Sequence, residues 1–326
     1  MKNPPFELTN QIVADVVEIA ELVGRLTTTS QLSATPSLRR SNRIKTIYGS
    51  LAIEQNTLTL DQVTAVLDGK RVLAPPKDIA EVRNAFEIYE RLETLDPYAI
   101  DDLLSAHSVM MRGLEQEAGM FRSGPVGVVN QAGVIVHFGT LPQYVPEAVA
   151  NLLDWVKSST LPMLIRSCVF HYEFELIHPF TDGNGRVGRL WHTLLLSKWN
   201  PLFAWLPVES IIHDRQQEYY EAINASNDAV SSTAFIEFML SAIKASLTDA
   251  IDTSDEMSDA ATDKTSDRWM QINNFLEYHN FIRNADVRQL FGVSAATANR
   301  ILAKFTAEGK LTKYREAGHW AYRKQI

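Results

Sequence analysis

The chain has 326 residues, enough for one large domain and a second, smaller one. Its formal charge of -8 argues against a protein that coats nucleic acid along its whole length. The single cysteine, Cys168, excludes an intramolecular disulfide and a cysteine-rich zinc site, and its apolar neighbours favour a small buried side chain.

The N-terminal residues 1–10 contain two prolines and a glutamate, and they do not form a secretory signal. The most apolar later segment, 190–208, is interrupted by polar residues and prolines. It falls short of the roughly 20 apolar residues that a membrane span needs. We therefore expect a cytoplasmic protein with no membrane partner.

Most of the chain predicts helices joined by short connections, so the expected fold class is mainly α. Apolar residues recur at helical spacing in 11–26. The helix at 59–67 begins at Thr59, which can cap it, and the helix at 77–95 follows Pro75 and Pro76. Further helices are expected at 41–52, 99–111, 145–158, 162–176, 186–198, 214–225 and 234–248.

One segment of the helical region predicts strands instead. Two short β-branched runs, 126–129 and 134–138, are separated by Asn130, Gln131, Ala132 and Gly133. Such runs around a turn-forming tetrapeptide indicate a β-hairpin.

The C-terminal part of the chain predicts a separate small domain. Residues 250–266 are small, polar and acidic, which indicates a linker or a weakly held helix. Helices are expected after it at 269–278, 284–291 and 295–308, followed by strands at 311–315 and 319–323. This order is that of a winged helix. The predicted domains are an N-terminal helical region (1–95), a core (96–249), an acidic linker (250–266) and a winged helix (267–326).

The segment 178–189, His-Pro-Phe-Thr-Asp-Gly-Asn-Gly-Arg-Val-Gly-Arg, combines groups that suit phosphoryl transfer. Gly183 and Gly185 flank Asn184 just before a helix, where successive N–H groups can bind an anion. Arg186 and Arg189 are three residues apart on that helix, and each can bind an oxyanion. Asp182 can hold a divalent cation between phosphates, and His178 titrates near neutral pH.

The segment matches the motif His-Pro-Phe-x-Asp/Glu-Gly-Asn-Gly-Arg-x-x-Arg at every fixed position, and it therefore resembles the Fic family of AMP-transferases. The resemblance covers roughly residues 96–247. It implies a Fic-type helical core with a β-hairpin flap. It also implies an enzyme that transfers AMP from ATP, with Mg²⁺, to a Ser, Thr or Tyr hydroxyl of a protein.

The resemblance also implies roles for single residues. His178 would be the general base, Asp182 would bind Mg²⁺, and Gly183, Asn184 and Gly185 would cradle the α- and β-phosphates. Arg186 would neutralise charge on the leaving pyrophosphate, and Arg189 would bind the γ-phosphate. The flap residues Val134, Ile135, Val136 and His137 would pair with an extended target segment. Tyr219, Tyr220 and Asn227 lie where relatives contact adenine, although a core or surface role fits them equally well.

A second motif resembles the inhibitory helix of Fic proteins that have this helix before the core. Ser50 and Glu54 match a Ser/Thr-x-x-x-Glu pattern that is usually followed by Gly or Asn. Here Gln55 occupies that position, and Asn56 comes one residue later. Glu54 would pair with Arg189 and so deny Arg189 to the γ-phosphate.

Three alternatives remain open at this stage. Residues 267–326 contain ten basic and five acidic residues, a net charge of +5, so DNA is a candidate partner, with Arg300 and Lys304 on the recognition helix. The chain would then be a nucleotide-sensing, DNA-binding regulator. In some relatives the glutamate that corresponds to Glu54 positions water to remove AMP, so AMP removal is a second alternative. A different phosphate-containing donor is the third, because nothing in the loop excludes it. The target protein is open, with the chain itself as one candidate, and so is a homodimer.

Overall fold

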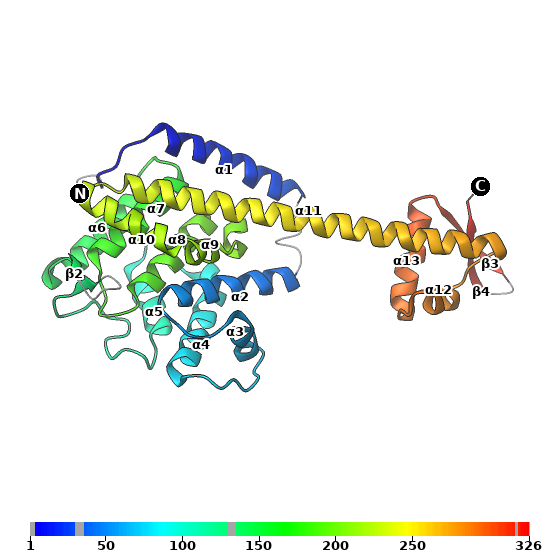
Figure 1. Ribbon diagram of the computed structural model, residues 1–326, viewed down its shortest axis with the longest axis horizontal. Helices are drawn as coiled ribbons and strands as arrows, with labels where there is room; N and C mark the ends of the chain where they lie inside the picture. The colour runs from blue at the N-terminus through cyan, green and yellow to red at the C-terminus, as the bar shows by residue number, and fades with distance from the viewer. Residues whose placement is uncertain (1–3, 30–35, 130–134, 317–318, 326) are drawn as a thin grey trace. The chain divides into compact units, whose positions relative to one another are not determined.

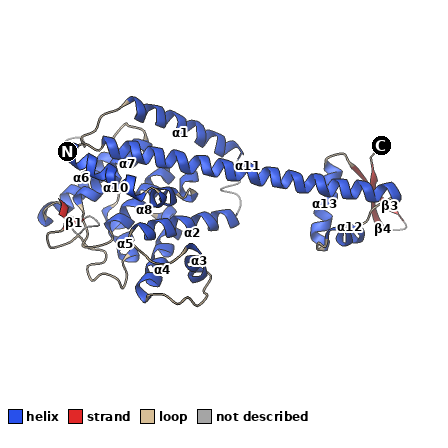
Figure 2. Ribbon diagram, in the orientation of Figure 1, coloured by secondary structure: helices blue, strands red, loops and turns tan. Residues whose placement is uncertain are grey.

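The computed structural model describes residues 4–29, 36–129, 135–316 and 319–325, and the chain divides into two compact units, Met1–Asp252 and Thr253–Ile326. Helices dominate the described residues, and the strands described form two two-stranded antiparallel sheets (Figure 2). The expected fold class, mainly α, is confirmed.

The helices and strands up to residue 278 follow the labels of Figure 1. They are α1 (Asn10–Thr29), α2 (Pro36–Ile53), α3 (Leu60–Leu67), α4 (Pro76–Glu90), α5 (Ile100–Met110), β1 (Gly127–Val129), β2 (Ile135–Phe138), α6 (Val145–Ser158), α7 (Met163–Ile177), α8 (Asn184–Trp199), α9 (Val208–Asp214), α10 (Gln216–Ala229) and α11 (Thr233–Tyr278). Short 3-10 turns lie at Leu92–Thr94, Pro142–Tyr144 and Pro201–Trp205.

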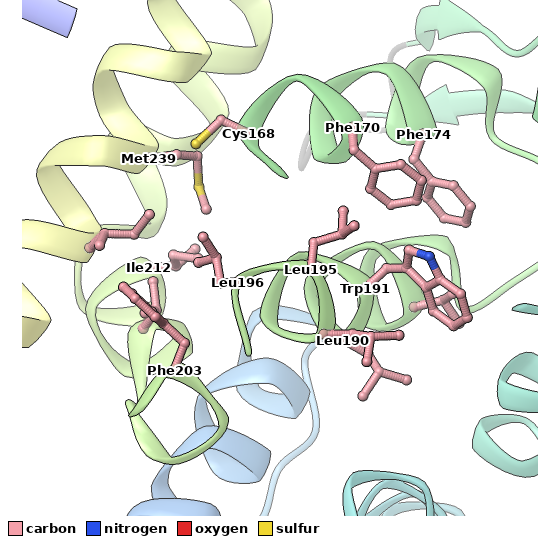
Figure 3. Packing of buried hydrophobic residues seen from close by; sticks show 14 of the residues in the cluster. Cys168, Phe170, Phe174, Leu190, Trp191, Leu195, Leu196, Phe203, Ile212 and Met239 are labelled. Carbon is pink, nitrogen blue, oxygen red and sulfur yellow. The ribbon is translucent and has the colours of Figure 1, made fainter. Parts of the chain in front are cut away.

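The core of the first unit is built around α7 and α8. Figure 3 shows Phe170 and Phe174 of α7 facing Trp191 and Leu195 of α8, and all four side chains are fully buried. Helix α7 buries side chains on most of its circumference, which is typical of a helix covered on all sides. The loop 178–183 is therefore anchored in the core at both ends. Cys168 also lies in this core, as predicted, and burial raises the pKa of its thiol.

Two helix starts follow the signals read from the sequence. Thr59 caps α3 in a capping box: its side chain accepts from the Gln62 backbone, and the Gln62 side chain accepts from the Thr59 backbone. Helix α4 begins with Pro76 in its first turn, where a missing N–H has no cost. Both predictions are confirmed.

Helix α11 is longer than expected. Residues 250–266, expected as a linker or a weakly held helix, are helical and continuous with the residues on either side. Residues 269–278 are helical and end at Tyr278, as predicted, but they form the last part of α11 and not a separate helix. No glycine or proline occurs between Thr233 and Tyr278, so nothing in the sequence interrupts the helix. Within the ranges described, no helix is both long enough and apolar enough to cross a membrane.

The predicted hairpin is confirmed. Strands β1 and β2 pair antiparallel, with Gly127 opposite Phe138 and Val128 opposite His137. The register shifts between Val128 and Val129. The turn and Val134, which was predicted to belong to the flap, lie outside the described residues.

The second unit contains the elements expected for 284–326, in the expected order. These are α12 (Asn284–Phe291), α13 (Ala295–Ala307), β3 (Leu311–Glu316) and β4 (His319–Lys324). Gly292 ends α12 with a φ of 61°, which favours glycine. Ile282 bridges to Tyr322 of β4, and the unit has its own core, which includes Leu302 and Phe305. Its assignment as a winged helix stays a prediction.

Helices α2 and α9 approach closely at a glycine. A Cβ added at Gly49 would lie 2.7 Å from the backbone carbon and oxygen of Glu209 and 2.8 Å from the nitrogen of Ser210. Any larger residue at position 49 would therefore push α2 away from α9. This contact fixes the end of α2 that contains Ser50.

We predict that Gly49→Ala lowers the free energy of unfolding by about 1–3 kcal/mol, because backbone atoms cannot give way as a flexible side chain would. Gly24→Ala in α1 is the matched control, since an added Cβ there meets nothing within 4 Å. The control should be neutral or stabilising by up to about 1 kcal/mol. Equal effects of the two substitutions in urea denaturation would contradict the close approach of α2 and α9.

Candidate active site

His178 ends helix α7 in the left-handed region, with φ 51° and ψ 63°. Its Nδ1 lies 3.3 Å from the backbone oxygen of Glu175. Because a carbonyl oxygen only accepts hydrogen bonds, this contact assigns the proton of the neutral ring to Nδ1. The lone pair then remains on Nε2, so Nε2 is the atom that can accept a proton.

Arg122 fixes the backbone at His178 and the base of the hairpin. Its Nε donates to the His178 oxygen at 2.7 Å, and its Nη1 donates to the Gly124 oxygen at 2.7 Å. Its Nη2 donates to the Thr140 oxygen, and its backbone N–H donates to the Pro179 oxygen at 3.0 Å. Arg122 thus joins the loop after α7 to the segments on both sides of β1 and β2. Burial lowers the pKa of Arg122.

The loop between α7 and α8 is closed by Asn184. Its side-chain Nδ2 donates to the Phe180 oxygen and its Oδ1 accepts from the Phe180 N–H, both at 2.8 Å. Gly183 has a φ of 84°, and an added Cβ would lie 2.7 Å from the sulfur of Met111. Position 183 therefore requires glycine both for its conformation and for space.

His107 contacts the same loop at Phe180 and at the Asp182 backbone. Its ring stacks on Phe180 with centroids 3.7 Å apart. Its Nδ1 accepts from the Gly119 N–H at 2.9 Å, so its Nε2 carries the proton that is shared with the Asp182 oxygen at 3.0 Å. Burial lowers the pKa of His107 and favours this neutral form. His107 is therefore structural.

Asp182 and Arg186 form an ion pair at the start of α8. Arg186 Nη2 donates to Asp182 Oδ1 at 2.9 Å, and the Gly183 N–H donates to the same oxygen at 2.6 Å. Burial opposes ionisation of Asp182, but the Arg186 charge and these hydrogen bonds outweigh it and lower its pKa. The other guanidinium nitrogen, Nη1, donates to Glu81 Oε1 at 3.0 Å.

Arg189 is the most completely enclosed charge of the site, with 2% of its side chain exposed. Its Nη2 donates to Glu54 Oε1 at 2.7 Å and to the Ser50 oxygen at 2.9 Å, and its Nε donates to Ser50 Oγ at 3.1 Å. Burial opposes the charge of Arg189, but Glu54 outweighs burial and raises its pKa. Arg189 is therefore cationic, and Ser50 and Glu54 accept hydrogen bonds from its Nε and Nη2.

The Glu54 carboxylate lies directly over Gly185. A Cβ added at Gly185 would overlap Glu54 Oε1 and lie 3.0 Å from Arg189 Nη1. The first turn of a helix has N–H groups without acceptors inside the helix, which attract anions. An anion, here a carboxylate, thus occupies the space between the glycine turn and Arg189.

The end of α2 holds Glu54 in a strained turn. Gln55 has a φ of 66°, and the Asn56 N–H donates to the Leu51 oxygen while the Gln55 N–H donates to the Ala52 oxygen. This is the Schellman ending, whose left-handed position favours Gly or Asn. The sequence departs from the usual motif at the residue that takes this conformation.

Glu175 is a carboxyl group beside His178 with 17% of its side chain exposed. Its Oε2 lies 3.9 Å from His178 Nδ1, and no hydrogen-bond partner for its buried Oε1 occurs in the described part of the chain. Burial raises the pKa of Glu175 to about 7, and the Glu54 charge adds to this, while Arg189 opposes it. Glu175 therefore changes its charge near neutral pH.

The residues expected to contact adenine lie in α10. Tyr219 is buried, with its hydroxyl 3.2 Å from His171 Nε2. Tyr220 is half-buried and accepts from Gln216 Nε2 at 3.4 Å, and the same amide donates to the Ile53 oxygen at 3.0 Å. Asn227 Oδ1 accepts from the Tyr172 hydroxyl at 2.9 Å. The core role considered for Tyr219 is what its burial indicates, and the adenine contacts of Tyr220 and Asn227 stay predictions.

Asp182 is the carboxylate that can hold a metal ion here. It is half exposed, and its carboxylate accepts from the Gly183 N–H and from Arg186 through the same oxygen, Oδ1. Across the described ranges, no group of three or more His, Cys, Asp or Glu residues is arranged to hold a metal. A single carboxylate suits Mg²⁺, which takes its remaining ligands from phosphates and water.

The sequence predicted most of this site but missed three residues. The structure brings the residues of the two motifs together, as described above. They are His178, Asp182, Gly183, Asn184, Gly185, Arg186, Arg189, Ser50 and Glu54. Arg122, Glu81 and Glu175 were not singled out as functional, although each contacts a predicted residue or lies beside one. The sequence does not single out these residues, because it does not show whether an Arg or Glu side chain will be buried.

Comparisons with known proteins show relatives of this chain in sequence and in fold. The model of the Fic/DOC family matches residues 94–196. The crystal structure of a Fic family protein from Desulfovibrio desulfuricans G20 is 42% identical, covers 99% of this chain and 98% of that one, and superposes with a TM-score of 0.76. A fragment of Fic-1 from Caenorhabditis elegans, 23% identical with a TM-score of 0.64, shares the fold over 76% of this chain and 73% of its own.

Curated relatives are similar over a shorter range. The protein adenylyltransferase fic-1 of Caenorhabditis briggsae is 33% identical over 194 residues, which are 56% of this chain and 36% of that protein. The protein adenylyltransferase Fic of Nematostella vectensis is 31% identical over 194 residues, 56% of this chain and 42% of that protein. The chain thus spans well under half the length of these two relatives.

We predict that Glu175→Gln removes a pH dependence of stability. The folded-state pKa of Glu175, about 7, lies above the ordinary value of 4.5. The stabilisation from its protonated form is therefore complete below pH 4.5 and is lost as the pH rises through 7. Relative to wild type, the variant should gain about 2–3 kcal/mol in unfolding free energy between pH 4.5 and 7.5. Glu21→Gln on the exposed face of α1 controls for the lost charge, and parallel pH profiles of wild type and Glu175→Gln would contradict the prediction.

Proposed function

The chain belongs to the Fic family, and from this membership we propose that it is a protein adenylyltransferase that Glu54 holds in an inhibited state. It would transfer AMP from ATP to a hydroxyl group of a protein side chain. The observation that supports this most directly is the Glu54 carboxylate bound between Gly185 and Arg189, because it marks a built anion site. The curated relatives carry the name protein adenylyltransferase.

The phosphates of ATP would bind along the first turn of α8. Asn184 and Gly185 present the N–H groups at the start of α8, and the Gly183 N–H before them donates to Asp182 Oδ1 in this structure. Asn184 itself is locked to Phe180, so the turn is preformed and need not be ordered by the nucleotide. Arg189 would bind the γ-phosphate once Glu54 has left.

Because the proton of the neutral His178 ring is on Nδ1, Nε2 can act as the base in the transfer step. The target hydroxyl oxygen attacks the α-phosphorus, and His178 Nε2 accepts the hydroxyl proton. The bond between the α-phosphorus and its bridging oxygen breaks, and the electron pair leaves with pyrophosphate. Arg186 neutralises the charge that grows on this leaving group. When Glu175 is ionised, its carboxylate, 3.9 Å from His178 Nδ1, favours the imidazolium that His178 becomes.

Asp182 would hold Mg²⁺, which supplies positive charge to the phosphates when bound. Asp182 is suited to this because its pKa is lowered and half of its side chain is exposed.

The hairpin β1–β2 would bring the target to His178. It is tied to the His178 backbone by Arg122, so a segment paired with the hairpin has a fixed position relative to the base. The acceptor is a Ser, Thr or Tyr hydroxyl that such an extended segment presents.

Glu54 would inhibit the enzyme by competing with the nucleotide. It neutralises Arg189 and places a negative charge over Gly185. Glu54 sits at the end of a helix with 33% of its side chain exposed, so it can leave without opening the core. A charge-assisted pair of this kind is worth a few kcal/mol, and about 1.4 kcal/mol corresponds to a tenfold change in rate.

The proposal is tested by transfer of α-³²P label from ATP to protein, with cell lysate as acceptor. Glu54→Gly should raise labelling at least about tenfold over wild type, because Arg189 becomes available. Glu54→Gly/His178→Ala should abolish it, because the base is lost. No label with any variant would overturn the proposal and would point to another phosphate-containing donor or to a nucleotide sensor.

We further propose that the second unit binds duplex DNA. Arg300 and Lys304 are exposed on α13, and Trp320 of β4 is 50% exposed, with Lys313 4.2 Å and Arg315 4.8 Å from its ring. Exposed cations on a helix and on the adjacent hairpin suit phosphate contacts, and the unit's net charge of +5 adds attraction.

Fluorescence anisotropy with a labelled DNA duplex tests this second function. Binding by the full chain should weaken steeply with salt, and Arg300→Glu/Lys304→Glu should weaken it at least about tenfold at low salt. Arg25→Glu/Arg83→Glu makes the same charge change in the first unit and should have a small effect. Equal losses in both variants, or no binding by wild type, would exclude a DNA site on α13.

A further inference from the structure

Arg186 is held by two carboxylates of different character. Its side chain is 3% exposed. Glu81 of α4 is 6% exposed and pairs with Nη1, whereas Asp182 is 49% exposed and pairs with Nη2. One partner is therefore enclosed with Arg186, and the other lies at the surface.

Both carboxylate oxygens of Glu81 are occupied. Oε1 accepts from Arg186, and Oε2 accepts from Asn56 Nδ2 at 2.7 Å. Asn56 also donates to the Asp78 oxygen at 3.2 Å, and Asp78 Oδ2 accepts from the Thr57 N–H at 3.0 Å. Glu81 is thus fixed between the arginine of the phosphate loop and the residue that follows the Glu54 turn. It lies outside residues 94–196, the range that the family model matches.

We propose that Glu81 is a positioning residue that keeps Arg186 directed at the leaving pyrophosphate, an inference that rests on the proposed transferase function. Asp182 is four residues before Arg186, and its two oxygens match the fork of the guanidinium. Without Glu81, Arg186 turns fully onto Asp182, and a phosphate must then break a bidentate pair. With Glu81 holding Nη1, the second nitrogen can exchange Asp182 for a phosphate oxygen while the buried charge stays paired.

Glu81 differs in this from Glu54. Glu54 lies at a helix end and competes with the nucleotide, whereas Glu81 is enclosed in the middle of α4 with both oxygens used. Loss of Glu54 therefore raises activity, and loss of Glu81 lowers it.

Glu81→Gln tests the inference, because an amide has one acceptor oxygen for two donors, Arg186 and Asn56. In the Glu54→Gly background, kcat for AMP transfer should fall at least about tenfold, with KM for ATP changed less than about threefold. Glu54→Gly/Asn56→Ala is the matched control, because it removes the other partner of Glu81 and leaves the Arg186 pair intact. It should keep kcat within about twofold.

Binding of inorganic pyrophosphate, measured by calorimetry in the same variants, gives a readout without turnover. Glu81→Gln should weaken pyrophosphate binding at least about fivefold and leave adenosine binding unchanged. Unchanged or tighter pyrophosphate binding, or equal effects of Glu81→Gln and Asn56→Ala, would overturn the inference and leave Glu81 a structural ion pair. If Glu54→Gly transfers no AMP, the proposed function fails, and the pyrophosphate measurement still decides the role of Glu81.

Discussion

The ion pair between Glu54 and Arg189 is the contact on which the rest of the site depends. Arg189 is almost fully enclosed, so its charge must be neutralised by whatever occupies the space over Gly185. In this structure the occupant is the carboxylate at the end of α2. With ATP bound, we propose that it is the γ-phosphate. Carboxylate and phosphate exclude one another because both need the same guanidinium and the same glycine turn.

The fold makes this competition specific because it fixes Arg189 and leaves Glu54 adjustable. Arg189 extends from α8, in the centre of the core, and Ser50 accepts hydrogen bonds from its Nε and Nη2. Helix α2 can place Ser50 there because Gly49 allows it to touch the backbone of α9. Glu54 lies one turn later, beside a left-handed Gln55 that costs roughly 1 kcal/mol relative to glycine. The turn at Glu54 is therefore less stable than the same turn with glycine at position 55.

The charges around the phosphate loop form a connected set. Each arginine of the loop has a partner from the N-terminal region, Glu54 for Arg189 and Glu81 for Arg186. Asn56 lies two residues after Glu54 and binds Glu81, so the turn at Glu54 and the Arg186 pair are connected through one hydrogen-bond chain. The N-terminal region therefore supplies an acidic partner for each of the two arginines, which lie more than a hundred residues later in the chain.

The sequence predicted the parts of the molecule that depend on local patterns. Helical periodicity, the Thr59 cap and the 178–189 motif gave the mainly α fold and the residues that surround the α8 N-terminus. The sequence missed Arg122 and Glu81 because their importance comes from burial and from partners far along the chain. The helical state of residues 250–266 was left open because acidic composition suggests a linker, while the absence of glycine and proline permits a helix. Gln55 shows a further limit, since its left-handed conformation is set by the turn and not by its own preference.

The most direct test of this account compares the affinities of the chain for ATP and ADP, which differ only in the γ-phosphate. Wild type should bind the two with affinities within about threefold, because Glu54 occupies the γ-phosphate place. Glu54→Gly should prefer ATP by at least about tenfold, and Glu54→Gly/Arg189→Ala should lose that preference. A wild type that already prefers ATP, or a Glu54→Gly variant without any preference, would contradict the competition between Glu54 and the γ-phosphate for Arg189.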